Sequence, residues 1–130
     1  MLIKLIHAHP LLFPASRPPR HSALPDGWFA IAHALCCAIE AQLTSAELTA
    51  CGVARVSAVQ GRLEVAMMGA YPDAIDGLIE SAVLLSEVTC QECGERPASF
   101  RANGVNLTLC GFCEHERCIR AARNARPPAC

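Results

Sequence analysis

Aromatic residues are scarce in this chain of 130 residues, which holds one Trp, one Tyr and four Phe. Aromatic side chains bury the most surface per residue, so their scarcity predicts a modest core of aliphatic side chains. Proteins that bind single-stranded nucleic acid by base stacking interleave aromatic and basic residues. Only Phe100 and Phe112 lie near the arginine-rich end of the chain, which argues against that class of protein.

The sequence also lacks a long apolar run, and its first residues lack the order that we expect of a secretory signal. No apolar stretch reaches the roughly 18 to 20 residues that a membrane-spanning helix requires. The first apolar stretch is broken by His7, His9 and Pro10, and Ala15-Ser16-Arg17 is a poor cleavage site. We therefore expect a cytoplasmic protein.

Familiar catalytic patterns are missing as well. The sequence shows no Ser-His-Asp arrangement, no paired catalytic carboxylates and no phosphate-binding loop. His7-x-His9 could chelate a metal if it lay on a strand, but we expect no carboxylate or third ligand nearby. His33 lies between Ile31 and Leu35, and we expect a partly buried, hydrogen-bonded helix residue there. An enzyme is not expected.

The net charge of −1 hides an uneven distribution of charge. Residues 1–25 carry three basic residues and no acid, whereas residues 26–95 carry ten acids against two arginines. Residues 96–130 carry six arginines against two glutamates. Such blocks indicate electrostatic partners, although they say nothing about the fold.

Helical and strand periodicities predict an α+β fold. Residues 1–25 form a proline-rich N-terminal arm, which is irregular or extended from Pro10 onward. An α+β body over 26–88 follows, with a helix at 28–43, a β-hairpin of strands 53–59 and 62–68, and a helix at 73–87. The sequence thus predicts a helix-hairpin-helix body.

Finer expectations follow from the same patterns. In the first strand, simple alternation places Val53, Arg55, Ser57 and Val59 on one face. Leu85 belongs to the buried stripe of the second helix, and Asp73 is a plausible N-cap for it. An acidic stripe on the opposite side is either a solvated face or a partner-binding surface, and it consists of Asp73, Asp76, Glu80 and Glu87. Cys36 and Cys37 fall on or beside the buried stripe of the first helix.

The strongest chemical signal comes from cysteine spacing. Cys90-Gln-Glu-Cys93 is followed, after sixteen residues, by Cys110-Gly-Phe-Cys113. Two C-x2-C pairs at this spacing are typical of a four-thiolate Zn²⁺ site. Such a site has no open coordination position, so the metal would stabilise rather than catalyse. Gly94 and Gly111 would supply the tight backbone next to each pair.

The residues around the cysteines predict a zinc-ribbon module over 89–130. Segments 98–101 and 105–109 flank Asn103-Gly104, a dipeptide suited to a hairpin turn. Beyond Cys113 the sequence EHERCIRAARNAR is expected to be helical until Pro127-Pro128. A knuckle, a hairpin and a second pair that opens a helix make a treble-clef-like arrangement.

Alternatives to this site remain open at this point. The C-x2-C pairs could serve a redox function, or hold an iron–sulfur cluster. His115 or Cys118 could replace one of the ligands, because both lie close to Cys113 in the sequence. The sequence does not disclose the redox state of the remaining cysteines: Cys36, Cys37, Cys51, Cys118 and Cys130.

Arginines recur every third residue in the predicted C-terminal helix. Arg117, Arg120, Arg123 and Arg126 would form a drifting basic ridge, which Arg101 on the hairpin could join. Such a ridge could contact phosphates or an acidic protein surface, or simply face solvent. It makes direct nucleic-acid binding an alternative function.

The order of these features resembles a known group of proteins. Asp26-Gly27-Trp28-Phe29, the hairpin, the second helix and the Cys90 to Cys113 ribbon together resemble small phage and prophage proteins with a Gly-Trp helix start and a terminal zinc ribbon. The resemblance implies a non-enzymatic protein of a bacterial host's cytoplasm. Such a protein would bind a host protein or protein–nucleic-acid complex as a regulator or inhibitor, for instance of a CRISPR-type defence system.

Overall fold

The computed structural model describes residues 1–102 and 106–124, and it has an α+β architecture with two small antiparallel sheets. The first sheet pairs β1 with β2, and the second pairs β3 with β4. In chain order the elements are α1 (Leu2–Ala8), a 3₁₀ turn (Asp26–Trp28), α2 (Phe29–Gln42), α3 (Ser45–Ala50), β1 (Cys51–Val59), β2 (Arg62–Gly69), α4 (Ala74–Ser86), β3 (Ser99–Ala102), β4 (Asn106–Leu109) and α5 (Gly111–Asn124).

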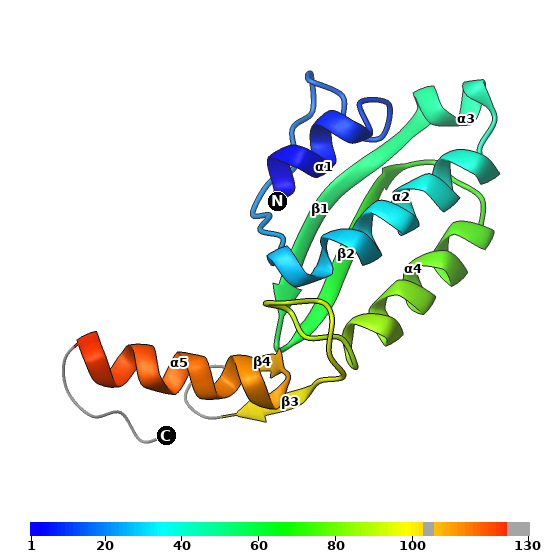
Figure 1. Ribbon diagram of the computed structural model, residues 1–130. Coiled ribbons are helices and arrows are strands. Elements are labelled where there is room, and N and C mark those ends of the chain that lie inside the picture. Colours follow the sequence, from blue (N-terminus) through cyan, green and yellow to red (C-terminus); the bar gives the residue numbers. More distant parts are fainter. Residues whose placement is uncertain (103–105, 125–130) are drawn as a thin grey trace.

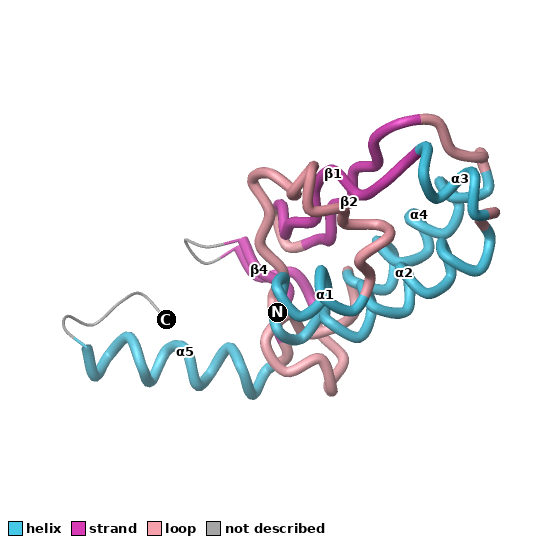
Figure 2. The backbone as a smooth tube through the Cα atoms, turned by 90° about the horizontal axis from the view of Figure 1, so that it is seen from above, coloured by secondary structure: helices cyan, strands magenta, loops and turns pink. Residues whose placement is uncertain are grey.

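The larger sheet is covered by helices on one face. α2 contacts α1 on one side and α4 on the other, and α4 also contacts β2. Figures 1 and 2 show this helical layer against the β1–β2 hairpin, while α5 extends away from it. None of the described helices is long and apolar enough to span a bilayer.

One apolar core lies between the helical layer and the hairpin. Its centre is Trp28, which is fully buried and donates a hydrogen bond from Nε1 to the Thr89 carbonyl at 2.9 Å. The other fully buried apolar side chains are mainly aliphatic, as the shortage of aromatic residues predicts. The largest are Leu5, Leu12, Ile39, Leu63 and Ile75.

The N-terminal segment is part of this core. Helix α1 was not expected, and Leu5 on it is fully buried. After it the chain runs irregularly along β1, where the Val53 amide donates to the Leu12 carbonyl at 2.8 Å and the Ala23 amide donates to the Val56 carbonyl at 3.0 Å. These bonds satisfy backbone groups on the outer edge of β1, which would otherwise be open to pairing with another chain.

The β1–β2 hairpin turns at Gln60-Gly61, where it was expected. Both residues have positive φ, 52° and 74°, as a two-residue type I′ turn requires. The expected alternation along β1 is wrong, however, because a register irregularity lies between Val53 and Arg55. An extra residue in one strand reverses the alternation beyond it, so Val53 and Val56 are both buried.

The two long helices agree with the sequence prediction to within a residue or two at each end, but one face differs. Leu85 is 51% exposed, whereas Ser86 is fully buried. The Ser86 hydroxyl donates to the Val83 carbonyl at 2.6 Å and accepts the Leu63 amide at 2.9 Å. A polar residue therefore occupies the buried position because it joins α4 to β2 through a satisfied hydrogen bond.

Helix α3 was missed by the sequence analysis, although its start carries a recognisable signal. The Thr44 side chain accepts the Glu47 amide at 3.2 Å, and the Glu47 carboxylate accepts the Thr44 amide at 2.9 Å. This reciprocal pair is a capping box, whose signature is Ser or Thr followed three residues later by Glu or Gln. At the start of α4, by contrast, Asp73 occupies the N-cap position without a side-chain capping bond.

Candidate metal centre

The four cysteines of the two C-x2-C pairs come from three local structures. Cys90 and Cys93 lie in a tight turn after α4, Cys110 directly follows β4, and Cys113 lies in the first turn of α5. The turn that contains Cys90 and Cys93 is closed by the Gly94 amide, which donates to the Cys90 carbonyl at 2.9 Å. Gly94 has a positive φ of 70°, in agreement with the tight backbone expected there. Gly111 has no positive φ and is the first residue of α5.

The four sulfur atoms converge at one point. All four Sγ atoms lie within 4.8 Å of one another, and the Cys93 and Cys110 sulfurs are 3.9 Å apart. Thiolates bound tetrahedrally to zinc at about 2.3 Å are separated by about 3.8 Å. The geometry is therefore compatible with one bound metal ion held by all four residues.

A small hairpin brings the two pairs together. β3 and β4 pair from Ser99 opposite Leu109 to Ala102 opposite Asn106, close to the strands expected from the sequence. Leu109 is buried in a second apolar cluster with three of the cysteines, and Ala98 and Leu107 pack against it. The cluster is small, so a metal ion would add much of the stability of this module. The expected turn at Asn103-Gly104, between these two strands, lies outside the described residues.

The surroundings of the sulfurs favour thiolates at two positions. Backbone N–H groups of Glu95 and Arg96 hydrogen-bond the Cys93 sulfur and lower the pKa of its thiol to about 6. Burial alone would raise the pKa of the Cys110 thiol, but hydrogen bonds, led by one from the Cys113 backbone N–H, lower it overall. The Arg96 guanidinium adds a donor 3.9 Å from the Cys93 sulfur.

Cys113 behaves differently, because burial among the other sulfurs raises the pKa of its thiol. Four thiols this close together cannot all ionise without a compensating positive charge. A divalent cation supplies that charge, and it coordinates thiolates rather than thiols. The donor set of the site thus fits a soft or borderline metal such as zinc.

The cysteine module is attached to the body by a contact between two backbones. The Gly27 amide donates to the Gln91 carbonyl at 2.9 Å. A Cβ atom on Gly27 would lie 2.3 Å from the Cys90 carbonyl oxygen, and one on Gly94 would lie 2.4 Å from the Gly27 carbonyl oxygen. Only glycine at both positions permits this approach, which explains structurally why Gly27 precedes Trp28.

A second attachment involves Thr108 at the end of β4. Thr108 is 1% exposed, and its amide donates to the Gln91 side chain at 2.9 Å. In return the Gln91 amide donates to the Thr108 carbonyl at 3.0 Å. The Thr108 hydroxyl also donates to the Gly61 carbonyl in the turn of the larger hairpin. The first C-x2-C turn, β4 and the body are therefore joined through one buried residue.

Neither His115 nor Cys118 belongs to this group of ligand atoms. Both residues are described, and the four-sulfur group contains only Cys90, Cys93, Cys110 and Cys113. The alternative in which one of them replaces a ligand is therefore not favoured by the geometry.

The expected basic ridge is split between two environments. Arg101 pairs with Glu114 at 2.8 Å and Arg117 pairs with Glu92 at 2.6 Å, both near the base of α5. Arg120 and Arg123 are exposed, and within the described part of the chain neither forms an ion pair. Arg126 lies beyond residue 124, outside the described residues.

The acidic stripe lies on α4 and its approach. Asp73, Asp76 and Glu80 are all exposed, and Asp76 accepts a hydrogen bond from the Tyr71 hydroxyl at 3.1 Å. The N-terminal end of α4 is at the opposite end of the molecule from α5 (Figure 1). The structure therefore does not bring the acidic stripe and the basic ridge into one site.

A second group of potential ligands was missed. His9, His33 and Cys37 place ligand atoms within 4.8 Å of one another. His33 is half-buried and hydrogen-bonded, as expected, but the expectation that no carboxylate lies near His9 is wrong, because Glu40 is 2.5 Å away. The four residues come from two helical regions far apart in sequence, and spacing along the chain carries no signal for such a group.

Comparisons with protein-family models, with curated proteins and with solved structures find no match to this chain.

Proposed function

We propose that this chain is a zinc-stabilised, non-enzymatic binding protein that presents helix α5 to a macromolecular partner. The convergence of four cysteine sulfurs supports the zinc site. Four thiolates complete the tetrahedral coordination of the ion, so no position is left for water or substrate. The metal then acts as a structural brace for the segment that carries α5.

The order of elements in this segment supports a treble-clef-like module. A cysteine turn precedes the β3–β4 hairpin, and the second cysteine pair opens α5. With metal bound, the ion would fix the start of α5 relative to the hairpin and to the first cysteine turn. The helix would thereby be held rigidly in one direction.

The observation that carries the proposal is the exposure of α5. Among its fourteen residues only Cys113 is buried, and residues 120–124 are exposed on every side. A helix of this length gains little stability from its own hydrogen bonds in water. A helix that projects from the molecule without an apolar face against its own core is suited to contact another molecule.

The charges of α5 indicate the kind of partner. Arg120 and Arg123 project where no described acid neutralises them, whereas Arg101 and Arg117 are already paired with glutamates. An acidic surface on a protein or protein–nucleic-acid complex would complement this end of the helix. Following the resemblance to phage proteins, we propose a bacterial complex as the partner, of the kind that phage inhibitors bind, including CRISPR-type defence complexes.

Charge reversal tests this proposal. The zinc-loaded chain is used as bait in a bacterial lysate, in parallel with the Arg120→Glu/Arg123→Glu double variant and with Arg17→Glu, a charge reversal at an exposed arginine away from α5. The proposal expects a protein complex that is retained by the wild type and by Arg17→Glu but lost by the double variant. Equal capture by all three proteins, with zinc bound in each, would contradict it.

Direct binding to nucleic acid is the second candidate, and the same two unpaired arginines favour it. In that case the chain binds duplex DNA with an affinity that falls steeply with salt, by a slope of about −0.9 per neutralised phosphate. Removing Arg120 and Arg123 would lower the magnitude of the slope by about 2. Binding to purified protein complexes that lack nucleic acid would exclude this alternative as the main function.

A further inference from the structure

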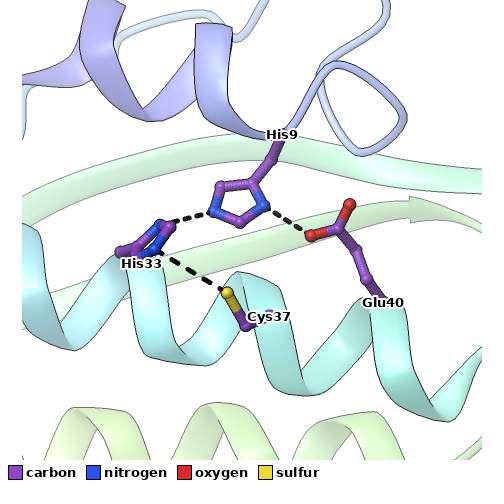
Figure 3. A network of polar contacts seen from close by, with 4 residues as sticks. All are labelled: His9, His33, Cys37 and Glu40. Atoms are coloured by element: carbon purple, nitrogen blue, oxygen red, sulfur yellow. Dashed lines mark hydrogen bonds and ion pairs between the residues drawn. The ribbon is translucent and has the colours of Figure 1, made fainter.

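A continuous chain of polar contacts connects four residues on the face of α2 that α1 covers. Glu40 contacts His9 Nδ1 at 2.5 Å, His9 Nε2 contacts His33 Nδ1 at 2.8 Å, and His33 Nε2 contacts the Cys37 sulfur at 3.8 Å. Figure 3 shows the four side chains in sequence, with His9 between Glu40 and His33. His33 and Cys37 are one helical turn apart on α2, while His9 comes from the end of α1.

The direction of each hydrogen bond follows from the carboxylate at one end. An ionised Glu40 can only accept, so His9 donates from Nδ1 and its Nε2 is left as an acceptor. His33 must therefore donate from Nδ1, which leaves its Nε2 lone pair facing the Cys37 thiol. Each group in the chain thus orients the next, and the last one is a base beside a thiol.

We propose that Glu40, His9 and His33 form a relay that makes Cys37 a nucleophilic thiol, the site of covalent modification by small disulfides. His33 is the base that accepts the thiol proton, while His9 and Glu40 are positioning residues that fix its tautomer and orientation. A nucleophile within reach of a base that is itself held by a third group is the general signature of an activated side chain.

Burial separates Cys37 from its neighbour. Cys37 is exposed, whereas Cys36 is 3% exposed. Burial, together with the negative charge of Glu40, raises the pKa of the Cys36 thiol to about 12. Reactive cysteines are exposed and lie near positive or proton-accepting groups, whereas buried ones are inert. The two adjacent cysteines therefore provide a reactive thiol and an internal control.

An aromatic ring packs on the imidazole of His33. The Phe29 ring stacks on the His33 ring, with centroids 5.6 Å apart and an interplanar angle of 8°. The Lys4 ammonium lies over the Phe29 ring, 5.1 Å from its centroid. The stacked Phe29 ring therefore limits rotation of the His33 imidazole and helps to hold it in the orientation that faces Cys37.

The distance between the two histidines also favours a relay over a metal site. Two nitrogens bound tetrahedrally to one zinc ion at about 2.0 Å are about 3.3 Å apart. The 2.8 Å between His9 Nε2 and His33 Nδ1 lies instead within the ordinary range of a hydrogen bond. A metal bound to both atoms would have to replace that bond.

The proposed reaction is a thiol–disulfide exchange. The Cys37 proton moves to His33 Nε2, and the thiolate attacks one sulfur of the disulfide. A new bond forms between Cys37 Sγ and that sulfur while the original S–S bond breaks, and the departing thiolate takes the proton from His33. The products are a mixed disulfide on Cys37 and one free thiol.

The test measures which cysteine of the zinc-loaded full chain reacts first. The protein is exposed to glutathione disulfide or, separately, to iodoacetamide at pH 7, and the modified residues are located by peptide mass spectrometry. Cys37 should react before Cys36 and Cys51. An ordinary thiol is only a few per cent ionised at pH 7, so His33→Ala should slow modification of Cys37 by about tenfold.

Two further variants separate a relay from simple exposure. Glu40→Gln keeps the shape of the side chain but removes its charge, and Cys37 modification should then rise with pH as in an ordinary thiol, whereas the wild-type rate stays high toward neutral pH. The other titratable or charged groups near this network are Cys36, which is adjacent to Cys37 in the chain, and Lys4, which lies over the Phe29 ring. His7→Ala, at an exposed histidine outside the network, should leave the rate unchanged.

Three results would overturn the proposal. The first is a rate of Cys37 modification no faster than that of an ordinary exposed thiol. The second is an unchanged rate of Cys37 modification in His33→Ala, while the zinc content and circular dichroism of this variant match the wild type. The third is a second metal equivalent per chain that disappears in His33→Ala. The last result would identify the cluster as a metal site instead.

Discussion

The backbones of Gly27 and Gly94 touch although 66 residues separate them in the chain, because neither residue has a side chain to hold them apart. The contact places the start of the α2 region directly against the first cysteine turn. The four-cysteine cluster is therefore firmly attached to the body. Its turn is positioned by the same segment that buries Trp28 in the core.

This contact predicts opposite effects for two glycine substitutions. Gly27→Ala puts a Cβ atom 2.3 Å from the Cys90 carbonyl oxygen, so it should destabilise the protein by about 1 to 3 kcal/mol. Gly77→Ala, in α4 with nothing within 4 Å of the added Cβ, should stabilise it by about 1 kcal/mol. Urea unfolding measures both, and destabilisation of equal size at the two positions would refute the contact.

Ser86 provides a second paired prediction. Ser86→Ala leaves the Leu63 amide without its acceptor inside the core, which should cost about 1 to 3 kcal/mol. Ser81→Ala serves as the control, because the Ser81 hydroxyl is exposed and bonds only to the Gly77 carbonyl of its own helix. Its free energy of unfolding should change by less than about 0.5 kcal/mol. If the two variants unfold at the same urea concentration, the link between α4 and β2 is not stabilising.

Local sequence patterns predict only part of this fold. The α2 and α4 helices and the hairpin turn at Gln60-Gly61 follow from local periodicity and turn chemistry, and the structure has them at nearly the expected positions. The burial of Ser86 in place of Leu85 does not follow from local periodicity, because it depends on the hydrogen bond that α4 makes with β2. Likewise, one inserted residue in β1 reverses its faces without changing the apolar pattern that identifies it as a strand.

The convergence of the four cysteines was predictable because they occur in two short pairs at the spacing that a tetrahedral metal site requires. The Gly27 contact and the His9–Glu40 pair could not be predicted, because each joins residues that are far apart in the chain and that no local pattern relates. Helix α3 is a different case. Its capping box at Thr44 and Glu47 has a sequence signature from which the start of the helix could have been predicted.

Acidification should release the metal. The pKa of the Cys93 thiol is lowered to about 6 by hydrogen bonds from the backbone N–H groups of Glu95 and Arg96, so the folded state favours its thiolate. Such a group stabilises the folded state above its unfolded pKa, and the contribution is lost as pH falls through about 6. Zinc release followed with a chromophoric chelator should therefore begin as the pH drops toward and below that value. Release that is independent of pH between 7 and 5 would contradict this assignment.

Loss of one ligand should weaken metal binding, whereas loss of a cysteine outside the four-sulfur group should not. Cys93→Ser removes a thiolate from the coordination shell, so the variant should lose its metal to a competing chelator at concentrations that leave the wild type loaded. Cys37→Ser, at an exposed cysteine outside the four-sulfur group, should retain metal as well as the wild type does. Equal retention by both variants would mean that Cys93 is not a ligand.

The most direct test of the account is the composition of the metal centre in the purified chain. Elemental analysis combined with X-ray absorption at the zinc edge should find one zinc per chain, surrounded by four sulfurs at about 2.3 Å. A chain without metal, a shell containing nitrogen or oxygen, or disulfides among Cys90, Cys93, Cys110 and Cys113 would contradict it.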